Sequence, residues 1–266
     1  MLARGRGTRM QRAAGKAAGL TDAQREMAAR GLKAMIPFKR PFLDYVISAL
    51  ADAGCTDVCL IVGPGQDAIR EHYEHAHPPR RARVSFAVQP AALGTADAIL
   101  TAAPFTRDEA FLALNADNYY PVEVYRALAA LGGQGLPAFS RDALLRDSNI
   151  DPERIRSFAL LRLSPNGDLQ DIVEKPDDDT YSAMAEGDVS VSMNIWRFDE
   201  RIHEACRRIQ PSPRGELELP NAVRFAVREL RQRFRTFPVE TGVLDLSRPD
   251  DIPEVGRRLA AIDPQP

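Results

Sequence analysis

The sequence predicts a mixed α/β fold, with a mostly parallel β-sheet flanked by helices. Short apolar runs alternate with amphipathic helical patterns, which is typical of βαβ units. Of the 266 residues, 44% are hydrophobic and 27% charged, close to the norm for globular proteins. A chain of this length buries a large core without disulfide bridges. Because it shows no internal repeat and no linker, we expect one domain, residues 1–266.

Strands and helices are expected in alternation along the chain. The predicted buried strands are residues 57–62, 84–89 and 111–115, and the predicted helices between them are residues 41–53, 66–75 and 95–103. Residues 157–175 predict two strands joined by Pro165-Asn166-Gly167-Asp168, because Asn-Gly between alternating hydrophobic residues favours a hairpin. The last third predicts helices at 199–209 and 217–233, a strand pair within 234–246 and a final helix from Pro249.

Charge and cysteine content narrow the class of partner. With 35 basic and 37 acidic residues, the net charge of −2 argues against a nucleic-acid partner. No apolar run approaches the ~20 residues of a membrane span, so we expect no membrane partner. If Cys55 and Cys59 share a strand, their spacing of four residues puts them too far apart for a disulfide, and a reducing, cytoplasmic location is the simpler interpretation.

A glycine-rich segment opens the chain, Leu2-Ala3-Arg4-Gly5-Arg6-Gly7-Thr8-Arg9-Met10. The two glycines let backbone N–H groups approach a phosphate without an intervening Cβ. The planar guanidinium of Arg9, just after them, is suited to hold a polyphosphate. A second segment, Lys33-Ala34-Met35-Ile36-Pro37-Phe38-Lys39-Arg40-Pro41-Phe42, leads into an amphipathic helix.

Together the two segments resemble the signature of the sugar-1-phosphate nucleotidylyltransferases, LAAGxGTRMxP…KAMLPVxxKPxL, and in particular that of the glucose-1-phosphate thymidylyltransferases and uridylyltransferases. The resemblance implies a Rossmann-like, GT-A-like fold of the nucleotide-diphospho-sugar transferases. Residues 1–140 would bind the nucleotide, and residues 141–266 would bind the sugar phosphate and supply the C-terminal helices. Arg9 would steady the pyrophosphate and Lys33 would lie on the phosphates; the implied nucleotide-binding residues of the loop are Ala3, Gly5, Gly7 and Thr8.

Gln89-Pro90 and Leu93-Gly94-Thr95-Ala96 resemble the family segment QxxxLGTAxA. The amide of Gln89 offers one donor and one acceptor, enough to contact a uracil or thymine edge. Gly94 would let the base lie against the backbone. The resemblance implies nucleotide binding by Gln89, Gly94 and Thr95, whereas Thr95 considered alone is equally well explained as an ordinary helix N-cap.

Two acidic segments resemble the metal-binding motifs of the family. Leu114-Asn115-Ala116-Asp117-Asn118 resembles LxGDN at the carboxyl end of a strand, where ligands of open α/β sheets bind. A carboxylate there suits Mg²⁺, which prefers oxygen ligands and substrate phosphates. Val243-Leu244-Asp245-Leu246-Ser247-Arg248-Pro249 resembles WxDxGTP, with Ser247-Arg248 in place of Gly-Thr. Asp117 and Asp245 are the implied Mg²⁺ ligands, Asp117 also the implied catalytic carboxylate, and Glu240 remains an alternative to Asp245.

The sugar-phosphate residues are implied by four further segments. Val173-Glu174-Lys175-Pro176 resembles VEKP, in which the catalytic Lys175 would meet the phosphate oxygens and Glu174 the sugar hydroxyls. Ala159 and Asn194 stand where relatives carry glycine, and Asn194 would narrow the sugar pocket or add a hydrogen bond. Arg214 begins a segment resembling RGELEITD. The implied sugar-phosphate residues are Asn118, Ala159, Glu174, Asn194 and Arg214.

These resemblances predict a Mg²⁺-dependent enzyme that joins UTP or dTTP to a sugar 1-phosphate, by default glucose 1-phosphate, and releases pyrophosphate. Two other classes stay open: a non-catalytic nucleotide- or sugar-nucleotide-binding paralogue, and a glycosyltransferase with a related nucleotide-binding sheet. Arg4 in place of the usual alanine and Ser247-Arg248 in place of Gly-Thr motivate the former. So does the opening of the chain, where only Met1 and Leu2 supply the hydrophobic first strand expected of this fold. Homo-oligomerisation is left open by the sequence.

Overall fold

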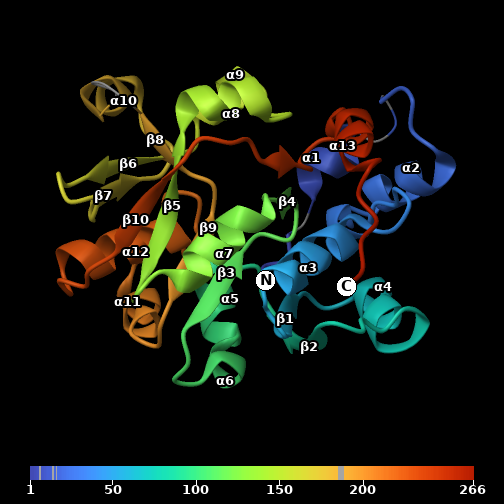
Figure 1. Cartoon of the computed structure of the whole chain (residues 1–266), viewed down its shortest axis with the longest axis horizontal. Helices are drawn as coiled ribbons and strands as arrows, with labels where there is room; N and C mark the ends of the chain where they lie inside the picture. Colours follow the sequence, from blue (N-terminus) through green and yellow to red (C-terminus); the bar gives the residue numbers. More distant parts are fainter. Residues whose placement is uncertain (6, 14, 16, 185–188) are drawn as a thin grey trace. The chain divides into compact units, whose positions relative to one another are not determined.

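The computed structural model describes residues 1–266 except for residues 6, 14, 16 and 185–188; Arg6 of the glycine-rich segment therefore lies outside the described residues. The chain forms two compact units, each discontinuous in sequence (Figure 1). Unit 1 comprises residues 1–90, 115–125 and 243–266; unit 2 comprises residues 91–114 and 126–242. The predicted functional halves divide the chain once, at residue 140. Each compact unit instead contains segments from both sides of that residue.

Unit 1 is built around a parallel strand pair. Its elements are α1 (Thr8–Ala13), α2 (Asp22–Ala29), the 3₁₀ turn η1 (Lys33–Met35), α3 (Phe42–Asp52), β1 (Asp57–Val62), α4 (Asp67–Glu71), the π turn η2 (His72–Ala76), β2 (Arg83–Val88), β4 (Asn118–Tyr119), β11 (Leu244–Asp245) and α13 (Asp251–Leu259). β1 pairs with β2 in parallel along its whole length. The predicted strand at 57–62 and the helix that begins after Pro41 are confirmed.

The first strand is reduced to a bridge. Leu2 pairs in parallel with both Ile61 and Asn115, so residues 1–3 lie between β1 and the start of the 115–119 segment. Backbone hydrogen bonds from Ala3 N to Ile61 O and from Ile61 N to Met1 O, both 2.9 Å, complete this pairing. The glycines therefore directly follow the carboxyl end of this short extended segment, residues 1–3, which is bridged on both sides.

Unit 2 contains a seven-stranded sheet in the order β3-β9-β5-β8-β6-β7, with β10 also paired to β5. Its elements are α5 (Thr95–Thr101), α6 (Ala103–Thr106), β3 (Phe111–Leu114), β5 (Gly135–Ser140), α8 (Arg141–Asp147), α9 (Pro152–Arg156), β6 (Ala159–Leu163), β7 (Leu169–Val173), α10 (Asp178–Met184), β8 (Ser190–Ser192), β9 (Ile195–Phe198), α11 (Ile202–Arg208), α12 (Leu219–Arg228) and β10 (Arg235–Val239). The junction between the units at residues 125–126 falls within α7 (Val122–Ala130).

The mixed α/β class with flanking helices is confirmed, but the larger sheet is more antiparallel than the sequence predicts. β5 and β10 are parallel, whereas the other pairs, among them β3–β9, β5–β8, β6–β8 and β6–β7, are antiparallel. The predicted hairpin at 157–175 is confirmed as β6–β7, and such a short turn can join only antiparallel strands. The predicted strand pair within 234–246 is wrong, because β10 pairs with β5 and β11 pairs with β4.

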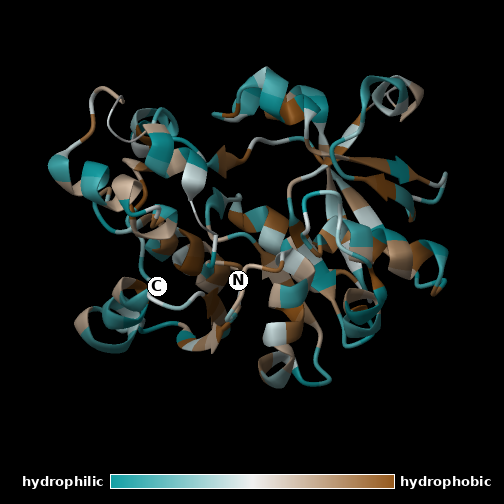
Figure 2. Cartoon of the chain, turned by 180° about the vertical axis from the view of Figure 1, so that it is seen from behind, coloured by the Kyte–Doolittle hydropathy of each residue, from teal (hydrophilic) through white to brown (hydrophobic). Residues whose placement is uncertain are grey.

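Helix α12 shows how the sequence pattern builds the core of unit 2. Its buried Leu219, Ala222, Val223 and Ala226 follow helical spacing and face the sheet. On the neighbouring stripe, Arg224 Nε and Arg228 Nη2 donate to the buried Asp171 of β7 at 2.9 and 2.5 Å. Figure 1 shows α12 and α11 beside the strands of unit 2. Figure 2 shows hydrophobic stretches along the strands and hydrophilic residues on peripheral helices such as α4.

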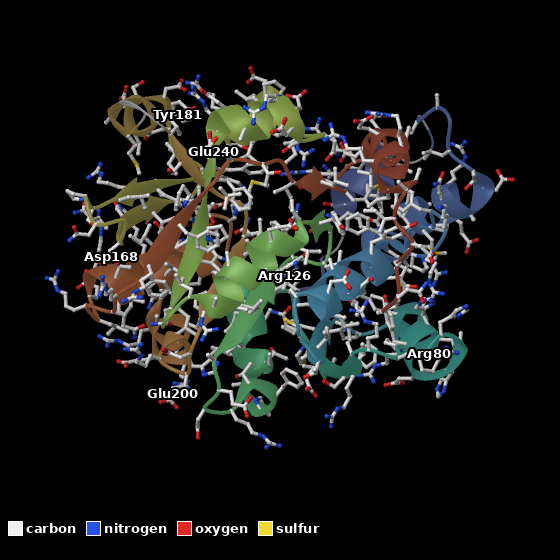
Figure 3. All side chains as sticks on the ribbon, viewed as in Figure 1. Arg80, Arg126, Asp168, Tyr181, Glu200 and Glu240 are labelled. Atoms are coloured by element: carbon white, nitrogen blue, oxygen red, sulfur yellow. The ribbon has the colours of Figure 1, made fainter. Side chains whose placement is uncertain are left out.

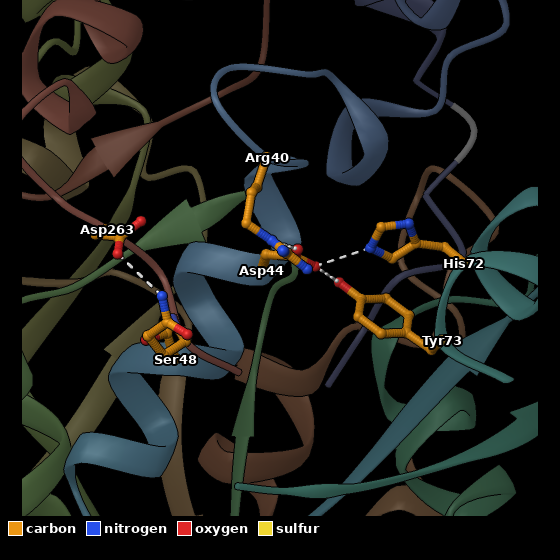
Figure 4. A network of polar contacts seen from close by, with 7 residues as sticks. Arg40, Asp44, Ser48, His72, Tyr73 and Asp263 are labelled. Carbon is orange, nitrogen blue, oxygen red and sulfur yellow. Dashed lines mark hydrogen bonds and ion pairs between the residues drawn. The ribbon is translucent and has the colours of Figure 1, made fainter. Parts of the chain in front are cut away.

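A buried carboxylate joins α3 to the α4–η2 segment in unit 1 (Figure 4). Asp44 is fully buried and accepts hydrogen bonds from Arg40 Nε at 2.6 Å and Tyr73 Oη at 2.8 Å. His72 Nε2 lies 3.1 Å from the same carboxylate, and its ring stacks on that of His77. Burial alone would raise the pKa of Asp44, but the hydrogen bonds from His72, Arg40 and Tyr73 outweigh it and hold this pKa below its usual value.

Asp44→Asn is expected to destabilise the protein by about 3 kcal/mol at pH 7, because an amide cannot accept all these donors and leaves the Arg40 charge unmatched. A carboxylate whose pKa is lowered by folding stabilises above its unfolded pKa, and this contribution is lost as the pH falls through the folded pKa. Urea unfolding at pH 7 and at pH 3 should therefore show a difference from wild type that shrinks at the lower pH. Asp57→Asn, which breaks a surface pair with Arg83, is the control, and an equal loss in both variants would contradict the role of Asp44.

Candidate functional site

The pairing of β4 with β11 brings two acidic segments together in unit 1. Asp245 pairs with Asn118 in the antiparallel register, and Leu246 N donates to Asp117 O at 2.9 Å. Asn118 Nδ2 also donates to the buried carboxylate of Asp245 at 3.0 Å. Residues far apart in the sequence thus present Asp117 and Asp245 on neighbouring backbone segments.

Lys33 of η1 completes this group and forms an ion pair and hydrogen bond with Asp117 Oδ2. Burial by itself would lower the pKa of Lys33, yet the charge and hydrogen bond of Asp117, with the charge of Asp245, raise it. The exposed Arg9, in the first turn of α1, is close enough for its positive charge to act against this rise. We call Arg9, Lys33, Asp117, Asn118 and Asp245 the unit 1 cluster.

The glycine-rich segment, residues 2–10, contributes Arg9 to this cluster. Gly7 has φ +59°, and a Cβ there would collide with the backbone of Gly31, so its conformation and its packing both require glycine. Gly5 is different, because its φ is outside the left-handed region and a Cβ would meet no atom within 4 Å. Ala3 is buried in the strand pairing, and the exposed Thr8 begins α1.

Gln89 directly follows β2 and is buried, whereas Gly94 and Thr95 belong to unit 2. Gly94 has φ +118°, and a Cβ there would lie 2.5 Å from Leu217 O. Leu217 N donates to Leu93 O at 2.7 Å, and Thr95 Oγ1 accepts from Leu219 N at 2.8 Å. The segment resembling LGTA is thereby joined to the one resembling RGELE.

Strand register places three of the predicted sugar-phosphate residues, Ala159, Glu174 and Asn194, at the same end of neighbouring strands in the unit 2 sheet, whereas Asn118 lies in unit 1. Ala159 begins β6 and pairs with Ser192 at the end of β8, and Leu160 pairs with Val173 at the end of β7. Glu174–Lys175 and Asn194 follow those two strand ends directly. Lys175 and Asn194 both have positive φ, +47° and +58°, in the left-handed region that non-glycine residues rarely adopt. Because asparagine is the residue that tolerates this region best after glycine, Asn194 keeps a glycine-like turn.

Arg214 is held by the buried carboxylate of Glu218, which is not among the predicted site residues. Glu218, at the N-cap of α12, accepts from Arg214 Nη2 at 2.6 Å, from Arg214 Nε at 3.0 Å and from Ser212 Oγ at 2.7 Å. Burial and the negative charge of Glu218 raise the pKa of Glu174, against the opposing charges of Lys175 and Arg214. Glu174, Lys175, Arg214 and Glu218 therefore share one electrostatic environment. Sequence spacing does not predict this pair, because Arg214 lies in the turn before α12 and not on a helix with Glu218.

Two predicted assignments fall in different surroundings. Glu240, the alternative to Asp245, is exposed in unit 2, and its charge acts on Arg146 (Figure 3). Asp245 lies with Asp117 in unit 1, so the structure favours Asp245 as the partner of Asp117. Lys175 belongs to unit 2. Within unit 1 the structure brings together the other charged residues expected at the phosphates, namely Arg9, Lys33, Asp117 and Asp245.

Two carboxylates are a suitable set for Mg²⁺, which is usually bound by one or two carboxylates together with substrate phosphates. Among the described residues, no group of three or more His, Cys, Asp or Glu side chains is arranged to hold a metal ion without such help. The three cysteines are free. None of the helices in the described part of the chain is both long and apolar enough to cross a membrane.

Comparison with known proteins identifies the fold and the class of this protein. The fold matches that of UDP-glucose pyrophosphorylase solved with UDP-glucose, with a TM-score of 0.72 and 18% identity, over 97% of this chain and 96% of that one. The family model of nucleotidyl transferases matches residues 25–260. The chain belongs to this nucleotidyl transferase family. The matched range begins after the glycine-rich segment, so the phosphate-binding role predicted for that segment does not rest on the family match.

Named relatives agree with that family. The chain is 24% identical to the UTP–glucose-1-phosphate uridylyltransferase AglF of Haloferax volcanii over 220 residues, which cover 83% of this chain and 84% of that one. It is 30% identical to the glucose-1-phosphate thymidylyltransferase of Streptomyces griseus over 196 residues, or 73% of this chain. The chain spans 51% of that thymidylyltransferase and 52% of the bifunctional protein GlmU of Methanocaldococcus jannaschii, about half the length of each.

Proposed function

We propose that this chain is a Mg²⁺-dependent sugar-1-phosphate nucleotidylyltransferase that uses UTP or dTTP, with glucose 1-phosphate as the default sugar substrate. The observation that carries the proposal is the unit 1 cluster, in which two cations and two carboxylates meet beside a glycine-rich segment in a member of the nucleotidyl transferase family. The names of the relatives, a uridylyltransferase and a thymidylyltransferase of glucose 1-phosphate, support the choice of substrates.

In the proposed reaction an oxygen of the sugar 1-phosphate attacks the α-phosphorus of the nucleotide in line. A new P–O bond forms as the bond between the α-phosphorus and the bridging oxygen breaks, and pyrophosphate leaves with the electron pair. Such chemistry depends mainly on positioning and on charge neutralisation. Asp117 and Asp245 would hold Mg²⁺, which when bound neutralises phosphate charge.

The chain's own residues would supply the remaining contacts. Lys33, released from Asp117 when phosphate binds, would place its ammonium on the phosphates, and Arg9 would steady the pyrophosphate. In unit 2, Lys175 would contact the sugar phosphate, with Arg214 oriented by Glu218. Gln89 and Gly94 would contact the base. A carboxyl with a raised pKa, such as that of Glu174, would exchange hydrogen bonds with sugar hydroxyls.

A pyrophosphate-release screen tests this function. UTP, dTTP, CTP, ATP and GTP would each be combined with a panel of sugar 1-phosphates in the presence of Mg²⁺. We expect release with UTP or dTTP and glucose 1-phosphate, and none after chelation of the metal. Nucleotide binding without release under every combination would favour the non-catalytic paralogue. Hydrolysis of, or transfer from, an NDP-sugar with no response to nucleoside triphosphates would favour a glycosyltransferase.

Gly5→Ala isolates the role of the glycine-rich segment. Since the added Cβ meets no protein atom within 4 Å and φ is outside the left-handed region, we expect unchanged thermal stability. The KM for the nucleoside triphosphate should nevertheless rise by about tenfold or more, because the Cβ would occupy space that the phosphate needs. Gly132→Ala, in the turn before β5, is the control. A KM within twofold of wild type would contradict phosphate binding by this segment.

A further inference from the structure

Arg4 stands inside the glycine-rich segment, where the family signature carries alanine, and its side chain extends to the end of β2. Its Nε donates to Gln89 O at 2.8 Å and its Nη2 donates to Pro90 O at 3.2 Å. Hydrogen bonds from a charged guanidinium are stronger than neutral ones. One side chain therefore fixes two successive carbonyl groups of the segment that contains the predicted base-contacting glutamine.

The structure makes room for this side chain at Gly63, directly after β1. A Cβ at Gly63 would lie 3.0 Å from Arg4 Cγ and 3.4 Å from Arg4 Nε. Gln66 adds two bonds to the same region: its Oε1 accepts from Gly63 N at 2.6 Å, and its Nε2 donates to Ala3 O at 3.2 Å. Residues 3–4, 63–66 and 89–90 are thus joined by the polar side chains of Arg4 and Gln66, which we call the polar clamp.

The polar clamp joins the segments that leave the carboxyl ends of three parallel strands, namely residues 1–3, β1 and β2. Ligands of open α/β sheets bind at this edge. Gln89 itself is buried, so its amide position depends on where the backbone of residues 89–90 is held. A base is read reliably only when the donor and acceptor that contact it are held in place before binding.

We propose that Arg4 is a positioning residue for nucleobase discrimination, acting through the backbone of Gln89 and Pro90. The proposal rests on the proposed function, because it assigns Gln89 to the base. Arg4 does not contact the nucleotide in this role. Its two donors hold the backbone carbonyl groups, and so the place from which the Gln89 side chain reaches the base. With the amide oriented toward uracil or thymine, cytosine meets it with donor and acceptor reversed.

The test compares Arg4→Ala, Arg4→Lys and Gly63→Ala with wild type. Arg4→Ala installs the residue of the family signature, and Gly63→Ala crowds the Arg4 side chain, which must shift by a few tenths of an ångström, while keeping its charge. Arg12→Ala, which removes one charge from the exposed face of α1, is the matched control. Binding of UTP, CTP and pyrophosphate would be measured by calorimetry in the absence of sugar phosphate, alongside kcat and KM for each nucleotide.

We expect Arg4→Ala to weaken UTP binding by about tenfold and to reduce the preference for UTP over CTP by a similar factor. Gly63→Ala should act in the same direction by a smaller factor. The kcat and the KM for glucose 1-phosphate should stay within twofold of wild type. Arg4→Lys should recover part of the preference, because its ammonium can still donate to one carbonyl. Arg12→Ala should behave as wild type.

Equal weakening for UTP, CTP and pyrophosphate in Arg4→Ala, with no effect in Gly63→Ala, would overturn the proposal and make Arg4 a phosphate contact. An unchanged preference in both variants, or a wild-type protein that binds neither nucleotide, would overturn it as well. Because binding is measured without turnover, a protein that discriminates UTP from CTP through Arg4 but releases no pyrophosphate would contradict the proposed enzyme activity and leave the positioning role supported.

Discussion

Asp117→Asn is expected to lower pyrophosphate release by about 10³-fold or more, equivalent to about 4 kcal/mol of transition-state stabilisation. The amide keeps the size of the carboxylate but removes the charge that would hold the metal and that now pairs with Lys33. Initial rates at saturating substrates and varied Mg²⁺ measure the effect. Circular dichroism and thermal melting should show that the fold is kept, because Asp245 still offers the partly buried Lys33 a negative charge.

Asp57→Asn is the control for this experiment, because it removes a carboxylate from the half-exposed surface of the same unit. It should leave the rate within twofold of wild type. If the Asp117→Asn enzyme retained turnover within about tenfold, a loss below ~1.4 kcal/mol, Asp117 would not hold the metal.

Gly94→Ala is expected to destabilise unit 2 by about 3–5 kcal/mol. Gly94 has φ +118° and ψ 179°, a region of backbone conformation that is essentially restricted to glycine. The new Cβ would also lie 2.5 Å from Leu217 O and 2.6 Å from Leu217 N. Those atoms take part in backbone hydrogen bonds to Ala96 and Leu93, so relief of the collision requires these bonds to move. Urea unfolding measures the loss, and nucleotide binding should weaken with it.

Gly133→Ala separates the two causes. Gly133 also has positive φ, +87°, but a Cβ there meets no atom within 4 Å. This variant should therefore lose only the conformational contribution, about 1 kcal/mol. Equal losses in Gly94→Ala and Gly133→Ala would show that contact with Leu217 contributes nothing.

Local sequence determined much of the framework. The apolar run DVCLIV predicted a buried strand, and β1 occupies the predicted residues 57–62. Pro41 set the start of α3, and Asn166-Gly167 set the β6–β7 turn. These features depend on φ restriction and on hydrophobic periodicity, which act between residues close in sequence. The motif resemblances also led to the nucleotidyl transferase family, to which the chain belongs.

Tertiary structure decided the features that depend on pairing between distant segments. Apart from the β6–β7 hairpin, the antiparallel pairs of unit 2 are not encoded in local propensity, and neither is the pairing of β10 and β11 with different strands, because strand partners are chosen by whole-sheet packing. The same holds for the choice of Asp245 over Glu240 beside Asp117, which depends on the β4–β11 pairing. The Arg4 contacts with Gln89 and Pro90 could not be predicted either, since a long side chain on a loop reaches whichever carbonyl groups the fold brings near it. The sequence by itself determined the elements and the chemical types at the site; the fold decided which of those groups meet, because their contacts join residues remote in the chain.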